Sequence, residues 1–235
     1  MNLYFLVEGS RTEYDVYPAW LNYLLPEFRR VTSPGLATRN SYYLISGEGY
    51  PSILNVHLPN AVKDINSHPH YDFLIVCVDA DELNPEERLA KVHEIVDESR
   101  RSKGAGWALQ NAKLHFVVQN RTIETWFLGN RKMISDAPQR DRLRNYLAFH
   151  DTRVLDPERM KLHPDFDRHA EFHHEYLKET FRDRGMTYRK NHPGHVKDKA
   201  YLEQLLLRIS NRPNDLKSFR EFIDFCSEVD RLSKL

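Results

Sequence analysis

The sequence contains little cysteine and no long apolar run. Two cysteines occur among 235 residues, Cys77 in a strand-like apolar run and Cys226 on an apolar helix face. We therefore predict two core thiols rather than a disulfide or a metal site. No stretch approaches the roughly twenty apolar residues that cross a bilayer. A strand begins almost at the first residue, without a leader pattern, so we expect a cytoplasmic protein with no membrane partner.

The chain also has no excess of either charge, with 34 basic and 34 acidic residues. Lysine and arginine side chains that neutralise phosphates supply most non-specific affinity for nucleic acid. Balanced charge therefore excludes a protein that binds nucleic acid over its whole surface, although the stretches 139–145 and 182–199 are locally basic. The phosphate-loop pattern G-x-x-x-x-G-K-[ST] is missing, so the sequence encodes no ATPase of that class.

Short apolar runs alternate with segments of helical periodicity, which is typical of an α/β fold with a mainly parallel sheet. Strands are predicted at 2–8, 42–46, 72–78 and 114–118. Helices are predicted at 12–25, 85–103, 200–209 and 218–225. A further helix is predicted to begin at a Ser52 cap and to carry Val56 on its apolar face. Past residue 135 the pattern is less regular until the last two helices.

Carboxylates follow two of the strand-like runs. Glu8 ends the run 3–7, and Asp79 and Asp81 end the run 73–78. The carboxyl ends of parallel strands point to one edge of the sheet, where ligands bind, so we expect these acids to converge. Clustered carboxylates repel one another, and a hard divalent cation such as Mg²⁺ or Mn²⁺ relieves the repulsion. The pattern predicts metal-assisted phosphoryl transfer.

Each acid also has a plain structural interpretation. A glutamate after a strand is favourable at the start of the following helix, and aspartate often ends a strand in a loop. The two acidic strand ends taken together favour the metal site.

The order of these motifs carries a family resemblance. Glu8-Gly9 after the first strand, with Asp79-Ala80-Asp81 after a later one, resembles the signature of TOPRIM domains, found in topoisomerases, bacterial primases and small nucleases. The run from Val7 to Glu13 is similar to single-domain TOPRIM proteins related to the OLD nucleases and to the RloB-like proteins of defence and restriction loci. The resemblance implies a Rossmann-like three-layer TOPRIM domain at 1–135. A mostly helical extension at 136–235 would pack on that domain or complete it.

The resemblance also implies further site residues. Glu13 would be a second metal-facing carboxylate, and Glu124, after the fourth strand, another metal ligand. Lys190 is similar in position to a late active-site lysine of OLD-like nucleases and would stabilise charge on a pentacovalent phosphate. Each residue also has a structural alternative. Glu13 could favour the helix dipole, and Glu124 could start a helix beside Trp126. Lys190 could be a solvated loop residue.

The basic stretch 182–199 is the candidate nucleic-acid surface. Arg189, Lys197 and Lys199 would contact phosphates, and Tyr188 would offer a stacking platform for a base. A rival metal site consists of His169 and His173, one helical turn apart, which could bind zinc. Because a third ligand at a convincing spacing is missing, a solvated helix face is the expected role of these histidines and of His174.

The implied function is that of a Mg²⁺- or Mn²⁺-dependent TOPRIM endonuclease, which hydrolyses phosphodiester bonds of DNA or RNA in antiviral defence or restriction. The catalytic residues would be Glu8, Asp79, Asp81 and Lys190. In a two-metal scheme, one ion held by Glu8, Asp79 and Asp81 activates water, and a second held by Glu13 or Glu124 stabilises the leaving oxygen.

An alternative from another class is a regulatory or effector subunit that works only in complex with a partner ATPase encoded nearby. Similar small TOPRIM proteins lack the ATPase domain that OLD nucleases carry in the same chain. Cleavage by the isolated chain would separate the two interpretations. A homo-oligomer is compatible with either.

Overall fold

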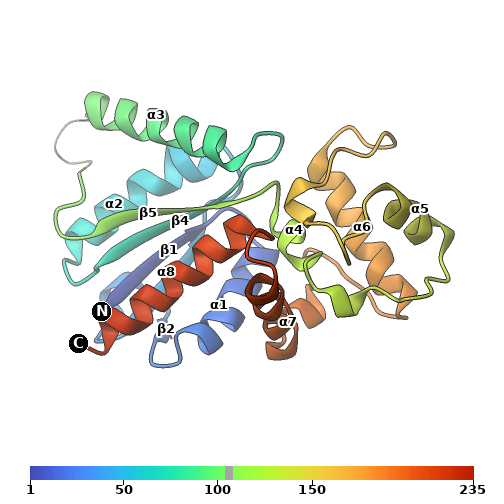
Figure 1. Ribbon diagram of the computed structural model, residues 1–235. Coiled ribbons are helices and arrows are strands. Elements are labelled where there is room, and N and C mark those ends of the chain that lie inside the picture. Colours follow the sequence, from blue (N-terminus) through green and yellow to red (C-terminus); the bar gives the residue numbers. More distant parts are fainter. Residues whose placement is uncertain (104–107) are drawn as a thin grey trace. The chain divides into compact units, whose positions relative to one another are not determined.

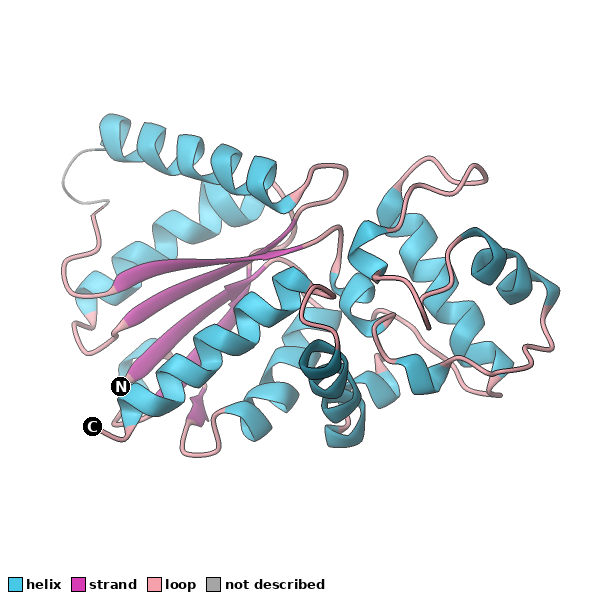
Figure 2. Cartoon of the chain, viewed as in Figure 1, coloured by secondary structure: helices cyan, strands magenta, loops and turns pink. Residues whose placement is uncertain are grey.

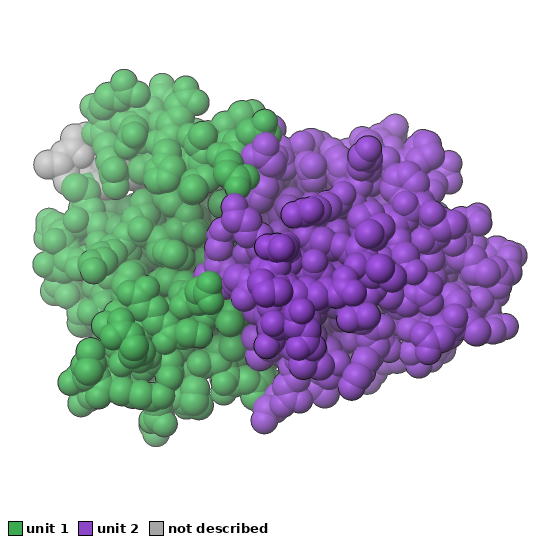
Figure 3. All heavy atoms as spheres, in the orientation of Figure 1, with its two compact units in different colours: residues 1–78, 86–118, 222–235 green, residues 79–85, 119–221 purple. Residues whose placement is uncertain are grey.

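The computed structural model describes residues 1–103 and 108–235 (Figure 1). The chain forms two compact units (Figure 3). The first contains residues 1–78, 86–118 and 222–235, and the second contains residues 79–85 and 119–221. The C-terminal segment therefore belongs to the same unit as the N-terminal strand.

Five strands form one parallel sheet in the order β2-β3-β1-β4-β5. Their bounds are Asn2–Val7 for β1, Arg29–Val31 for β2, Ser41–Ser46 for β3, Phe73–Asp79 for β4 and Lys113–Gln119 for β5. All six residues of β1 are buried, as expected for the central strand of a sheet covered on both faces. Strands occur at all four predicted places. β2 was not predicted, because this short edge strand is Arg-Arg-Val and has no apolar run.

Helices cover both faces of the sheet (Figure 2). The bounds are Thr12–Leu24 for α1, Leu58–Ser67 for α2, Pro85–Lys103 for α3 and Lys217–Ser233 for α8. Tyr4 of β1 donates a 2.9 Å hydrogen bond to Asp64 of α2. The next residue, Phe5, lies with its ring 6.3 Å from that of Tyr17 in α1, and Tyr17 contacts Phe222 of α8 at 5.3 Å. Since successive strand residues point to opposite faces, α2 lies on one face and α1 with α8 on the other. The α/β fold with a central parallel sheet is therefore confirmed, in a three-layer, Rossmann-like arrangement.

The predicted core thiols are confirmed, because Cys77 and Cys226 are both buried and neither of the two is in a disulfide. Burial raises the pKa of Cys226, and the neighbouring Cys77 raises it further. None of the described helices is both long and apolar enough to cross a membrane.

The helix start predicted at Ser52 differs in detail. In the described part of the chain Ser52 makes no side-chain capping bond, and a π-helical turn at Ile53–His57 leads into α2. Val56, expected on the apolar face, is 51% exposed. The prediction for these two residues is wrong, because the wider turn shifts the helical spacing on which it depended.

The second unit is helical. Its helices are α4 at Ile123–Phe127, α5 at Asp141–Phe149, α6 at His169–Asp183, α7 at Lys199–Asn211 and the first turn of α8. Aromatic side chains fill its core: Trp126, Phe127, Phe172, Tyr176 and Phe181 are all fully buried. The two amphipathic helices predicted near the C-terminus are confirmed as α7 and α8. A helix face was expected at the histidines of α6, without bounds, and α5 was not predicted.

Candidate active site

Glu8 follows β1 and is anchored by the main chain on both sides. Its N–H donates to the carbonyl of Cys77 in β4 (3.0 Å), and its carbonyl accepts from the N–H of Gly49 (2.9 Å). Oε1 of Glu8 accepts a 3.2 Å hydrogen bond from the N–H of Tyr50. The carboxylate is therefore oriented at the carboxyl edge of the sheet, where parallel α/β proteins bind ligands.

Glu13 lies in the first turn of α1, and its carboxylate packs against Gly9. A Cβ atom on residue 9 would be 1.9 Å from Oε2 of Glu13 and 2.5 Å from its Cδ. Gly9 therefore provides the space that the Glu13 carboxylate occupies. Glu13 is 7% exposed. The turn between β1 and α1 thus carries two carboxylates, both within the first unit.

Asp79 is the last residue of β4, the neighbour of β1 in the sheet. The parallel register pairs Val7 of β1 with Cys77 of β4. Glu8 stands one residue beyond that pair, and Asp79 two residues beyond it. Two adjacent strands therefore end in carboxylates.

Asp81 belongs to the loop that follows β4, and Arg121 fixes that loop within the second unit. The N–H of Asp81 donates to the carbonyl of Arg121 at 3.0 Å. In return, Nη1 of Arg121 donates to the carbonyls of Asp81 (3.1 Å) and Leu83 (2.9 Å). Asp81 has a φ of 52°, a left-handed conformation that aspartate tolerates better than most residues. The identity of Asp81 therefore has a structural reason in addition to the proposed catalytic one.

Within residues 1–103 and 108–235, no three His, Cys, Asp or Glu side chains are grouped so as to hold a metal ion. Mg²⁺ often binds through one or two carboxylates, several waters and the phosphates of its substrate. The acids at the β1–α1 turn and at the end of β4 provide the hard oxygen donors that this ion prefers, and Gly9 leaves room for the second carboxylate of the turn. Carboxylates are the residue type that a magnesium ion prefers, and the metal site stays a prediction.

In the second unit, Glu124 and Lys190, both predicted site residues, lie next to each other. Glu124 is in α4 and is 1% exposed. Its Oε1 accepts a 3.0 Å hydrogen bond from the hydroxyl of Tyr188. The same oxygen lies 3.4 Å from Nδ1 of His174 and 3.8 Å from Nζ of Lys190. One hydroxyl donor and two basic side chains thus surround a single buried carboxylate oxygen.

These partners decide the charge state of Glu124. Burial alone would raise its pKa, because a carboxylate loses its hydration. The nearby His174 ring, the charge of Lys190 and the Tyr188 hydroxyl outweigh burial and lower the pKa of Glu124 to about 2. Glu124 is therefore ionised at neutral pH, and cationic and hydrogen-bonding groups of its own unit balance its charge. It is better suited to hold Lys190 in place than to ligate a metal.

The expectation of a solvated histidine face on α6 is wrong for His173. That side chain is fully buried, and its Nδ1 lies 2.7 Å from Oγ1 of Thr125. Burial lowers the pKa of His173 to about 3, so the ring is neutral. His169 is bound differently, because its N–H donates to Oε1 of Glu82 (2.8 Å) and its Nδ1 lies 2.5 Å from Oε2 of that residue. The three histidines of α6 thus have separate structural partners.

The predicted nucleic-acid residues differ in their surroundings. Arg189 is exposed, and Lys199 pairs with Glu203 at 3.7 Å on the surface of α7. Lys197 is partly exposed. Tyr188 is 3% exposed and its hydroxyl is bonded to Glu124, so the predicted stacking platform is wrong. The cations remain a candidate phosphate surface without it.

Sequence reasoning missed the partners that surround Glu124. Tyr188 and His174 were assigned to a surface, because a tyrosine followed by two basic residues carries no local signal of burial. His173 did leave a signal, because it stands four residues before Leu177 and eight before Phe181, on the apolar spacing of a helix. Its burial among these residues follows that spacing.

Comparisons of the chain with protein-family models, with curated proteins and with solved structures find no match. The TOPRIM resemblance therefore rests on the residues of the chain. Function is inferred below from the chemistry of these side chains.

Proposed function

We propose that this chain is a Mg²⁺- or Mn²⁺-dependent nuclease of the TOPRIM class, which hydrolyses phosphodiester bonds of DNA or RNA as a cytoplasmic effector of antiviral defence or restriction. The observation that carries the proposal is the pair of adjacent parallel strands, β1 and β4, that end in Glu8 and Asp79. Ligands bind at this edge of an open α/β sheet, and carboxylates placed there suit a hard cation.

The proposed roles follow from the local structure. Glu8 and Asp79 would hold the ion, with Glu13 and Asp81 as further carboxylates. A bound ion would polarise the phosphate and lower the pKa of a coordinated water. The Tyr50 N–H bond to Glu8 keeps that carboxylate oriented at the edge of the sheet.

Lys190 would place a positive charge next to the phosphate undergoing attack, where negative charge increases in the transition state. Its side chain is 55% exposed, so a substrate can reach it. Glu124 would position this lysine rather than bind metal, because its Oε1 already has three partners. Arg189, Lys197 and Lys199 would contact the substrate backbone.

A cleavage assay tests this proposal. Purified chain is incubated with labelled single- and double-stranded DNA and RNA, with Mg²⁺, Mn²⁺ or chelator, alone and with the product of any neighbouring ATPase gene. We expect metal-dependent cleavage that Glu8→Gln abolishes, because the amide keeps the shape but loses the charge. Glu27→Gln, at an exposed glutamate of the same unit, is the matched control. Full activity of Glu8→Gln would refute the proposal.

A further inference from the structure

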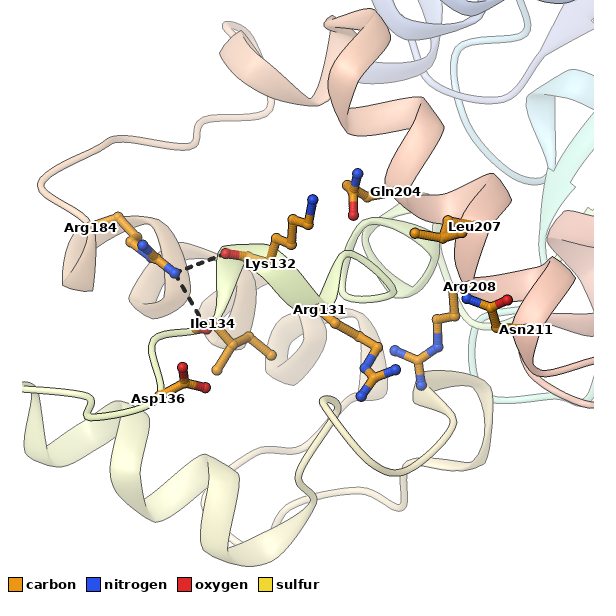
Figure 4. A pocket seen from close by; sticks show the side chains of 9 residues that line it. All are labelled: Arg131, Lys132, Ile134, Asp136, Arg184, Gln204, Leu207, Arg208 and Asn211. Carbon is orange, nitrogen blue, oxygen red and sulfur yellow. Dashed lines mark hydrogen bonds between the residues drawn. The ribbon is translucent and has the colours of Figure 1, made fainter.

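A cavity of about 510 Å³ opens on the second unit (Figure 4), and none of the proposed metal-binding or catalytic residues lines it. Four cationic side chains line it, together with a single carboxylate, that of Asp136. The cations are Arg131, Lys132, Arg184 and Arg208. Because like charges repel, such a lining is costly unless an anion or water screens it.

The cations Arg131 and Lys132 come from a short 3₁₀ turn, Arg131–Met133. Oδ1 of Asn130 accepts a 3.1 Å hydrogen bond from the N–H of Lys132 and so caps this turn. Both side chains are exposed. Within the described residues, the structure gives neither side chain a hydrogen-bond or ion-pair partner. Figure 4 shows Lys132 extended toward Gln204. These two cations are available to a ligand.

The other two cations build the pocket. The Arg208 side chain is fully buried and pairs with Asp215 at 2.8 Å. Its Nη1 and Nη2 donate to the carbonyls of Gly129, Thr152 and Leu155. Arg184, at the end of α6, connects that helix to the Arg131–Met133 turn, because its Nη2 donates to the carbonyl of Lys132 at 2.8 Å. The pocket therefore has a rigid, positively charged frame.

Arg131 and Arg208 interact unfavourably across the cavity. Burial lowers the pKa of Arg208, the like charge of Arg131 lowers it as well, and Asp215 and Asp156 act in the opposite direction. An anion bound between the cations would relieve this repulsion. A phosphate is well suited, because arginine donates to its oxygens in pairs.

The rest of the lining is suited to an organic ligand. Gln204 and Asn211 offer amide donors and acceptors, and Ile134 and Leu207 offer apolar surface. The volume lies within the roughly 300–1,000 Å³ of small-molecule sites. We infer that this pocket binds a nucleoside phosphate, with the phosphate at Arg131 and Lys132 and the base against Leu207 and the amides. The inference is independent of the proposed nuclease activity.

Isothermal titration of the full chain with ADP tests the inference, and adenosine and pyrophosphate serve as partial ligands. We expect ADP to bind more tightly than either. Arg131→Gln and Lys132→Gln should each weaken ADP binding roughly tenfold or more, since each removes a charge-assisted hydrogen bond. Lys161→Gln, at an exposed lysine of the same unit outside the pocket, should bind like the wild type.

A thermal-unfolding measurement shows whether each variant is folded. Without ligand, Arg131→Gln should unfold no earlier than the wild type, because the substitution removes a charge that repels Arg208. With ADP, the wild type and Lys161→Gln should be stabilised more than Arg131→Gln and Lys132→Gln at the same ligand concentration, as mass action requires. Absence of ADP binding, equal binding by all variants, or binding of a short oligonucleotide but not of ADP would each overturn the inference.

Discussion

The ammonium group of Lys190 lies 3.8 Å from Oε1 of Glu124, and the two side chains differ sharply in exposure, at 55% and 2%. The buried carboxylate is held from several sides, whereas the lysine remains open to solvent. Because of this difference in exposure, a substitution of Lys190 can affect activity without a large effect on stability.

Lys190→Met should change the free energy of unfolding by less than about 1 kcal/mol, because the lysine side chain is half exposed and Tyr188 still donates to the Glu124 carboxylate. Turnover should fall strongly while substrate binding changes less, because the proposed contact strengthens only in the transition state.

Combined replacement of Arg189, Lys197 and Lys199 should instead weaken binding uniformly and flatten its salt dependence. Equal losses of binding in the two variants would place Lys190 among ordinary phosphate contacts.

Glu124→Gln should destabilise the protein by about 1–3 kcal/mol at neutral pH, since it removes a buried charge that accepts a hydrogen bond from Tyr188 and lies next to His174 and Lys190. The folded-state pKa of Glu124 is about 2 and the ordinary value is 4.5. The stability that this charge supplies is therefore present above pH 4.5 and is lost as the pH falls through about 2.

Urea unfolding of the wild type and Glu124→Gln across this pH range measures the difference. It should shrink as the solution becomes more acidic. Glu171→Gln, at an exposed glutamate of α6, should show little effect. A difference that stays constant from neutral to acidic pH would mean that the charge of Glu124 is not what stabilises the unit.

Glu158 should give the opposite pH dependence. Burial raises its pKa from 4.5 to about 7, against the lowering effect of its hydrogen bonds with Ser218. The folded protein therefore favours the protonated acid, and stability falls as the pH rises from 4.5 through about 7. Glu158→Gln should lack this loss. The wild type should lose stability relative to the variant over that range, and parallel curves in urea unfolding would show that Glu158 ionises freely.

Gly9→Ala tests whether the β1–α1 turn contributes a metal ligand. The new Cβ would occupy the place of the Glu13 carboxylate, 1.9 Å from its Oε2. We expect Mn²⁺ affinity to fall roughly tenfold or more, in line with other changes around metal ligands. Gly35→Ala is the control, because its Cβ would meet only the His68 ring, at 3.1 Å. Unchanged affinity in Gly9→Ala, with Glu13 displaced, would remove Glu13 from the site.

Much of the first unit was predictable because its signals are local. β1 is an uninterrupted apolar run, and α3 extends over Pro85–Lys103, as the proline start and the apolar spacing predict. The acids Glu8 and Asp79 stand out because each ends such a run. The short strand β2 has no comparable pattern, and its place in the sheet depends on pairing with β3.

The second unit was less predictable because its signals are tertiary. The buried face of α6 includes Glu179, a charged residue that interrupts the hydrophobic spacing that marks a helix. His173 is buried because it meets Thr125, 48 residues earlier in the chain. Tyr188 likewise meets Glu124 across 64 residues. Such contacts cannot be inferred from neighbouring sequence alone.

The central claim is that the carboxylates at the ends of β1 and β4 bind a divalent cation, and calorimetric titration of Mn²⁺ tests it most directly. The wild type should bind Mn²⁺ or Mg²⁺ weakly and measurably. Asp79→Ala should lose that binding while unfolding no earlier than the wild type, because removing one of several like charges relieves repulsion. Unchanged Mn²⁺ affinity in a folded Asp79→Ala variant would contradict the metal site, and with it the proposed nuclease.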